Sequence, residues 1–175
     1  YGGAVYFDSP HAQNSVINCT FDNNDGLVAG GAIYLTGAAE ESLFYNNIFS
    51  NTPGYAVYEA AAGIDVELRN NLFFKNGADY WDENVVGYIG ASQLNTMPDS
   101  NGNMDDDPMY VEGYLGEHYL SNEDAGQILD QYNRLAADWG SSATSPCVDA
   151  GYGEPSDYDI GGLSTRTDNV ADGNK

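Results

Sequence analysis

The pentapeptide GGAVY at residues 2–6 returns as GGAIY at residues 30–34 and as GYAVY at residues 54–58. A second motif, Asn-x-x-Phe, begins 16 residues after the first Gly of each pentapeptide, at Asn18, Asn46 and Asn70. The return from Asn to the next Gly takes 12 residues and then 8. Two segments at fixed spacing with one variable connection indicate an internal repeat, which has to be identified before any fold is assigned.

The physical character of the repeat favours strands over helices. Each motif is short, rich in β-branched and aromatic residues, and alternates between two faces. Such strands can stack one per turn of a coil, about 4.8 Å apart, and bury their inward side chains against neighbouring coils. The sequence therefore predicts an all-β fold, a right-handed parallel β-helix of about four coils over residues 1–98. The fourth copy is weak, with Asp79-Tyr80-Trp81 in the Gly-x-Ala place and Asn95 as its Asn.

Two sets of equivalent side chains are expected to form columns along the coils. Asn tolerates left-handed dihedral angles and can hydrogen-bond to the Asn one coil away, so Asn18, Asn46 and Asn70 are predicted to form a ladder at a sharp corner. Tyr residues recur at equivalent places and should stack on one face, either outward, where they could bind sugar rings, or inward as core. These are Tyr6, Tyr34 and Tyr58.

Residues 99–175 lose the period and are predicted to form an irregular C-terminal region. It contains an acidic loop, short strands and one helix near 122–138, where apolar residues recur at helical spacing.

Composition narrows the classes of partner. The 175 residues contain 27 Asp and Glu against 5 Lys and Arg, a formal charge of -22. Such a surface repels nucleic acid and anionic lipid, whereas cations, neutral glycans and basic protein faces remain suitable partners. Hydrophobic residues make up 42%, too many for a disordered acidic tail. We expect no membrane span in this fragment, which opens within a repeat and without an initiator Met.

The two cysteines, Cys19 and Cys147, allow either a disulfide in an oxidising compartment or two free thiols. There is no CxxC pair, and His11 and His118 lie far apart, so no zinc site is predicted.

The order of motifs resembles a known group of proteins. After the three coils come DDPMYV at 106–111, GEHYLS at 116–121, SPCVDAG at 145–151 and LSTRTD at 163–168. This order is similar to the C-terminal part of right-handed β-helix proteins of the pectate-lyase-like superfamily, and more closely to bacterial surface proteins with a choice-of-anchor Q domain. The resemblance implies an extracellular or cell-surface location and large, multi-coil proteins, mostly without a demonstrated activity. A fold shared with lyases does not transfer their chemistry.

One acidic segment is a candidate cation site. Oxygen-bearing side chains alternate along a Gly-containing loop, as in short calcium loops, at Asp99, Asn101, Asn103, Asp105 and Asp107. The bidentate Glu of such loops is missing, because its place holds Tyr110. The alternative is a solvated acidic turn with Asp107 ahead of Pro108.

Lyases of this fold resemble one another in using calcium-binding carboxylates with a Lys or Arg base on an outward face. The basic candidates in the coils are Arg69 and Lys75, and Glu67 lies two residues before Arg69 on the same face. We interpret Arg69 and Glu67 as an ordinary ion pair, because no carboxylates converge at one position of neighbouring coils.

These observations lead to two functional hypotheses. The first is a non-catalytic extracellular structural or adhesive module that can stack end to end, into a filament if the contact does not close. The second is a polysaccharide-binding or polysaccharide-degrading domain, with a cell-surface glycan as its partner and paired acids or a basic residue in a groove.

Overall fold

The computed structural model describes residues 2–8, 13–27, 29–37, 41–61, 64–84, 87–112, 118–120, 145–147 and 150–153. The chain divides into two compact units, Tyr1–Asp106 and Asp107–Lys175. In the described residues the regular structure is strand apart from one short helix, so the all-β prediction is confirmed. The helix predicted near 122–138 lies outside the described residues.

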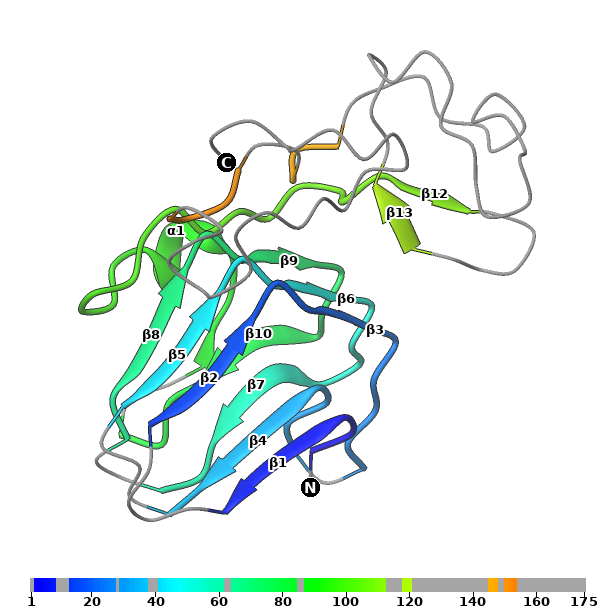
Figure 1. Ribbon diagram of the computed structural model, residues 1–175. Helices are drawn as coiled ribbons and strands as arrows, with labels where there is room; N and C mark the ends of the chain where they lie inside the picture. Colours follow the sequence, from blue (N-terminus) through cyan, green and yellow to red (C-terminus); the bar gives the residue numbers. More distant parts are fainter. Residues whose placement is uncertain are drawn as a thin grey trace. The chain divides into compact units, whose positions relative to one another are not determined.

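The first unit consists of three sheets whose neighbouring strands lie far apart in the sequence (Figure 1). In every sheet the repeat supplies one strand per copy, and these strands pair in parallel. The first sheet contains β1 (Val5–Asp8), β4 (Ile33–Thr36), β7 (Tyr55–Glu59) and β10 (Ala78–Trp81). The second contains β2 (Asn14–Ile17), β5 (Ser42–Tyr45) and β8 (Val66–Arg69). The third contains β3 (Thr20–Asp22), β6 (Ile48–Ser50) and β9 (Leu72–Phe74).

The register follows the sequence motifs. Tyr34 lies opposite both Tyr6 and Tyr58, and Phe49 lies opposite both Phe21 and Phe73. The predicted equivalence of the motifs is therefore confirmed by the strand pairing.

The corners between the second and third sheets are made by the Asn residues of the repeat. Asn18, Asn46 and Asn70 have φ of 56°, 58° and 52°, so the predicted left-handed backbone is confirmed. A short polar side chain reaches this region with less steric cost than other non-Gly residues.

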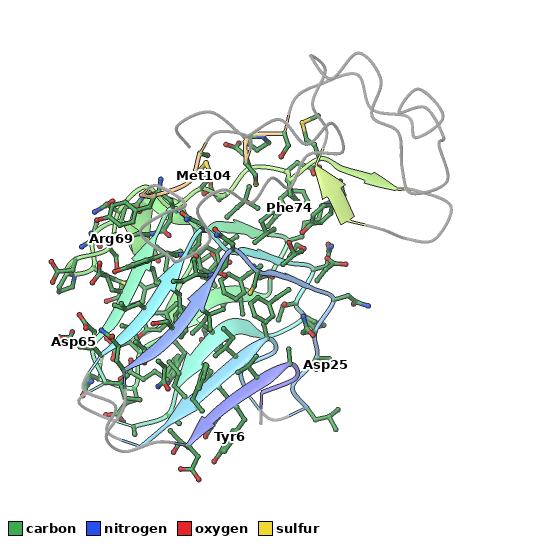
Figure 2. The ribbon with its side chains drawn as sticks, viewed as in Figure 1. Tyr6, Asp25, Asp65, Arg69, Phe74 and Met104 are labelled. Carbon is green, nitrogen blue, oxygen red and sulfur yellow. The ribbon has the colours of Figure 1, made fainter. Side chains whose placement is uncertain are left out.

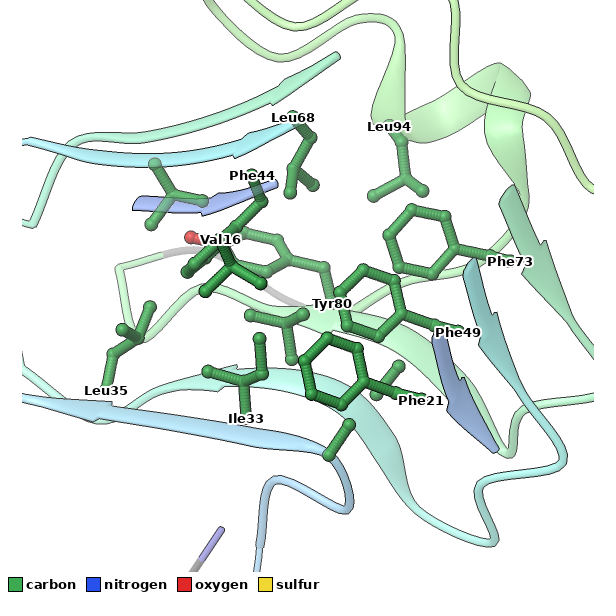
Figure 3. Close-up of a cluster of buried hydrophobic side chains, with 14 of the residues drawn as sticks. Val16, Phe21, Ile33, Leu35, Phe44, Phe49, Leu68, Phe73, Tyr80 and Leu94 are labelled. Carbon is green, nitrogen blue, oxygen red and sulfur yellow. The ribbon is translucent and has the colours of Figure 1, made fainter. Parts of the chain in front are cut away.

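The core fills the space enclosed by the three sheets (Figure 3). Phe21, Phe49 and Phe73 stack at centroid distances of 5.1 and 5.0 Å, and their neighbours come from the first two sheets. Fully buried members include Ile33, Leu35, Phe44, Val57 and Leu68. Burying each such side chain contributes about 1.5–3 kcal/mol, so the repeat is held together largely by its inward positions.

The stack is less covered at β1 than in its middle. Ile33 and Leu35 are 0% and 1% exposed, whereas Val5 and Phe7 at the same positions of β1 are half-buried. Within the described residues, β1, β2 and β3 each pair with one other strand. We call these three strands the open end.

The opposite end of the first unit is closed. The short strand β11 (Gly87–Tyr88) pairs antiparallel with β10 and ends the parallel series of its sheet. The helix α1 (Ala91–Leu94) follows, and its Leu94 is fully buried in the core. An antiparallel strand therefore ends the first sheet, and the buried residues of α1 pack on the core here. We call this the closed end.

The predicted alignment of the fourth copy is wrong. Tyr80 lies opposite Val57 and Trp81 opposite Tyr58, so Asp79-Tyr80-Trp81 fills the Ala-Val-Tyr places. Gly77 precedes this strand, and a Cβ there would lie 2.1 Å from the carbonyl oxygen of Pro53. The close approach of backbone from the preceding coil requires glycine at this position.

Asn95 is not the fourth corner. Asn101 and Met104 pair in parallel with Arg69 and Leu72, which places Gly102 (φ 68°) opposite Asn70. The start of the predicted acidic loop thus continues the stack, and the first unit extends past the expected boundary at residue 98.

The second unit contains an antiparallel pair, β12 (Tyr110–Glu112) and β13 (His118–Leu120). No helix among the described residues is long and apolar enough to cross a membrane.

Candidate functional site

A buried column of amides, which we call the Asn ladder, links the corners of successive coils through Asn47, Asn71 and Asn103. The backbone N–H and Nδ2 of Asn47 donate to Oδ1 of Asn71 at 2.9 and 3.0 Å. The same two groups of Asn71 donate to Oδ1 of Asn103, both at 3.1 Å. Each Nδ2 also donates to a main-chain carbonyl one coil back, those of Val16, Phe44 and Leu68 at 2.8, 2.7 and 2.8 Å.

The ladder predicted at Asn18, Asn46 and Asn70 is therefore displaced by one residue. Those residues make the turn, and the residue that follows each of them is the one whose side chain joins the ladder in the second and third coils. Asn18 is exposed, whereas Asn47 and Asn71 are 1% and 0% exposed. The second residue of each pair is the buried one, so its amide must be hydrogen-bonded, because an unpaired buried amide would cost free energy.

The ladder has two different ends. At the open end, the N–H of Cys19 donates to Oδ1 of Asn47 at 3.0 Å, so a thiol side chain occupies the place of an amide. At the closed end, Oδ1 of Asn95 accepts from the N–H and Nδ2 of Asn103, both at 2.9 Å. Nδ2 of Asn95 donates back to the carbonyl of Asn103 at 3.0 Å. Asn95 thus terminates the ladder.

The five residues predicted to bind calcium have separate roles in the structure. Asp99, Asn101 and Asp105 are exposed, and Asp105 accepts a 3.3 Å hydrogen bond from the N–H of Ala91. Asn103 is 5% exposed and belongs to the ladder. Asp107 belongs to the second unit and accepts from the N–H of Met109 at 2.8 Å, the geometry of an acidic turn.

Calcium binding by this segment stays a prediction. In the described part of the chain, no three His, Cys, Asp or Glu side chains group in a way that could hold a metal ion. Oδ1 of Asn103 already accepts two hydrogen bonds, so a cation would have to compete with Asn71 for it. Thermal unfolding in calcium and in chelator, for the natural chain and for Asp105→Asn, tests it. An equal midpoint of thermal unfolding in calcium and in chelator would contradict calcium binding by this segment.

A second column, the aromatic column, consists of Tyr6, Tyr34, Tyr58 and Trp81 and faces outward. Successive ring centroids lie 5.6, 5.5 and 5.8 Å apart with interplanar angles of 16°, 7° and 9°. Tyr6 is 49% exposed, and the other three rings are half-buried. The structure thus decides between the two predicted orientations in favour of the outward one.

The stacking limits what the aromatic column offers to a ligand. Each ring turns its faces toward its neighbours in the column, so the outward surface consists mainly of ring edges and phenol groups. Sugars stack on ring faces, whereas edges suit polar contacts. The main role of the aromatic column is therefore to stabilise the stacked strands, and it offers little ring-face surface to a ligand.

The basic candidate Arg69 is held by contacts with three residues. Its Nε forms an ion pair with Oε1 of Glu67, as expected, and donates to the carbonyl of Asp99 at 3.0 Å. The hydroxyl of Tyr45 donates to the same Glu67 oxygen at 2.6 Å, and the guanidinium lies 5.8 Å from the Tyr45 ring. Figure 2 shows Arg69 at the opposite end of the first unit from Tyr6. The contacts fix the Asp99 turn and leave Arg69 poorly placed as a base.

Lys75, the other basic candidate, is exposed at a corner with φ 52°. Its Nζ lies 4.6 Å from the centroid of the Phe74 ring, a cation–π contact. Cys19 and Cys147 are both free thiols, and burial raises the pKa of Cys147.

A buried carboxyl group was not anticipated from the sequence. Glu59 ends β7 in the register position that Leu35 holds in β4, and it is 1% exposed. The hydroxyl of Tyr80 donates to its Oε2, and its Oε1 has no hydrogen-bond partner among the residues that the structure describes. Burial raises the pKa of Glu59 to about 7, against the lowering effect of the Tyr80 bond. The alternation of β7 contained the signal, because it places an acid at an inward position.

Comparisons of the chain with protein-family models, with curated proteins and with solved structures give no match.

Proposed function

We propose that this chain is a right-handed parallel β-helix that serves as a non-catalytic structural or adhesive module outside the cell. The observation that carries the proposal is the in-register repetition of side chains from coil to coil. The Asn ladder, the aromatic column and the stacked Phe core each use one equivalent position per coil. Repetition of this kind is what a solenoid needs, because each repeat is stable only against its neighbours.

The engagement of reactive groups supports a non-catalytic role. Arg69 is held by Glu67 and the Asp99 carbonyl, and the ammonium group of Lys75 lies over the Phe74 ring. The amides of the ladder hydrogen-bond main-chain groups of the preceding coil. In the described coils, polar side chains are thus used to hold coils together, whereas an enzyme needs an acid, a base or a nucleophile poised toward a substrate.

The two different ends bear on self-assembly. The open end offers main-chain groups of β1, β2 and β3, whereas β11 and α1 cover the closed end. We propose that end-to-end contact between copies uses the edges of β1, β2 and β3. Sedimentation velocity over a range of concentrations tests this: association that rises with concentration is expected, and a monomer at every concentration would contradict it.

Catalysis is tested by an activity screen on acidic polysaccharides. We expect no turnover from the natural chain. Turnover that disappears in Arg69→Ala, while Lys75→Ala stays active, would overturn the non-catalytic assignment. The extracellular location rests on the resemblance to surface proteins and is tested by protease accessibility of the tagged protein on intact cells.

The outward aromatic column favours glycan binding as the second candidate. Its half-buried end ring, Trp81, also contacts Tyr55 edge-to-face at 5.4 Å. The acidic surface would select neutral over acidic glycans. Binding to a panel of neutral and acidic glycans that is lost in Trp81→Ala would support this candidate against the purely structural one.

A further inference from the structure

The buried carboxyl of Glu59 lies where the repeat elsewhere places an apolar side chain. Val57 and Glu59 both point inward from β7, and Leu35 is the neighbour of Glu59 in β4. Glu59 and Tyr80 are each 1% exposed, so neither group is hydrated. A buried carboxyl in this setting is stable only with a counter-charge or as the neutral acid.

Among the described residues, the groups that act on Glu59 provide no counter-charge. Tyr80 of β10 donates its hydroxyl, and the neighbour from β4 is the apolar Leu35. The charges that act on Glu59 come from Asp82 and Glu83 after β10 and from Asp65 before β8, and all three are negative. No three acids in the described residues group as a metal site. The neutral acid is therefore the form that the packing favours.

Glu59 is connected to the closed end through Tyr80. The Tyr80 ring lies 5.8 Å from that of Tyr88 in β11, its partner in the antiparallel pair. The next residue, Trp81, stacks on Tyr58 of β7. A change in the Glu59–Tyr80 contact therefore acts on the two strands, β10 and β11, that close the first sheet.

We propose that Glu59 and Tyr80 form a pH-responsive lock that holds β10 and β11 against β7. The lock is tight when the Glu59 carboxyl is protonated. Ionisation places an uncompensated negative charge in the core beside Tyr80, and water must enter between β7 and β10 to solvate it. The closed end then loosens, while the coils nearer the open end stay paired. The Oε1 atom of Glu59 has no hydrogen-bond partner in the part of the chain that the structure describes. This supports the proposed direction, because no donor there stabilises the anion.

Trp81 supplies the readout. In a Trp139→Phe background Trp81 is the remaining tryptophan, and its emission and the amide exchange of β10 and β11 are followed from about pH 5 to about pH 9. We expect a red shift of the emission and faster exchange at these strands, with a midpoint near 7. Exchange in β5 and β6 should change much less across the same range.

Two variants assign the transition. Glu59→Gln keeps the shape of the side chain and should abolish the transition. Glu83→Gln, an exposed neighbour, should keep it with a slightly lower midpoint, because Glu83 raises the pKa of Glu59. A transition that persists in Glu59→Gln, or its absence from the natural chain, would overturn the proposal.

Tyr80→Phe keeps the test decisive should Glu59→Gln fail to fold. Removing the hydroxyl deletes the bond that lowers the pKa of Glu59, so the midpoint should move above that of the natural chain. An unchanged or lower midpoint would show that the transition does not belong to this pair.

Discussion

Oδ1 of Asn103 accepts hydrogen bonds from both the main-chain N–H and the Nδ2 of Asn71, although the two residues are 32 positions apart. A single amide oxygen thus satisfies two donors of Asn71, the main-chain N–H after the turn and the Nδ2 of the side chain. Both residues are buried, at 5% and 0% exposed, so water does not replace these bonds. The column of amides thereby fixes the register of the coils.

Asn71→Ala should lower the free energy of unfolding by about 2–4 kcal/mol, because it removes the bonds of Nδ2 to the Phe44 carbonyl and to Asn103 Oδ1. It also leaves the N–H and Nδ2 of Asn47 without their acceptor, Oδ1 of Asn71. Urea unfolding measures the change. Asn84→Ala is the matched control, since Asn84 is exposed, and it should stay within about 0.5 kcal/mol. Equal effects of the two substitutions would contradict the importance of the ladder.

Two glycines at equivalent repeat positions should respond in opposite ways to alanine. Gly30 has φ 64°, and a Cβ there would lie 2.6 Å from the carbonyl oxygen of Ile33. Gly30→Ala should therefore destabilise by about 1–3 kcal/mol. A Cβ at Gly54 meets nothing within 4 Å, so Gly54→Ala should be neutral or stabilise by about 0.4–1 kcal/mol. Chemical unfolding of both variants provides the comparison, and a reversed order would contradict the structure.

Cys19→Asn should extend the ladder by one member. The Nδ2 of an amide side chain at this place can donate to Oδ1 of Asn47, as Asn47 itself does to Asn71. We expect a gain of about 0.5–1 kcal/mol in unfolding free energy. Cys19→Ser, which is too short to make this contact, should show no gain. A loss of stability in Cys19→Asn alone would mean that the open end differs from the inner coils.

The stability of the chain should depend on pH through Glu59. Its pKa is raised from 4.5 to about 7 in the folded state, so the folded state binds the proton more tightly. The contribution is fully present below about pH 4.5 and is lost as the pH rises through about 7, at a cost of about 3 kcal/mol. Unfolding free energies against pH should fall less steeply in Glu59→Gln than in the natural chain. Parallel curves would contradict the assignment.

Much of the architecture could be predicted because the repeat recurs at fixed spacing. The fixed offset between Tyr34 and Asn46 reflects a constant path through two sheets, and strand pairing follows it. The left-handed corners could also be predicted, since few residues other than Gly and Asn accept that backbone.

The position of the ladder could not be predicted because two Asn residues stand side by side at each of two corners. Asn46 and Asn47 look alike in the sequence, and only the direction of the backbone after the turn decides that Asn47 is buried. In the first copy Asn18 is followed by Cys19, so the Asn that recurs in all three copies is the turn residue and not the ladder residue.

The alignment of the fourth copy could not be predicted from the sequence for a related reason. A spacing of 16 residues connects Asp79 with Asn95 by coincidence, while strand pairing places Gly102 at the corner. The inserted β11 and α1 lengthen the connection, and a spacing rule has no means of including them.

The most direct test of the central claim, that the chain returns to the same place once per repeat, is disulfide crosslinking of paired positions. Ser15 and Leu43 face each other in parallel strands. In a Cys19→Ser, Cys147→Ser background, Ser15→Cys with Leu43→Cys should form a disulfide rapidly under mild oxidation, seen as faster migration on a non-reducing gel. Ser15→Cys with Ser42→Cys, whose side chains leave the sheet on opposite faces, should not. Equal crosslinking of both pairs, or of neither, would contradict the stacked coil.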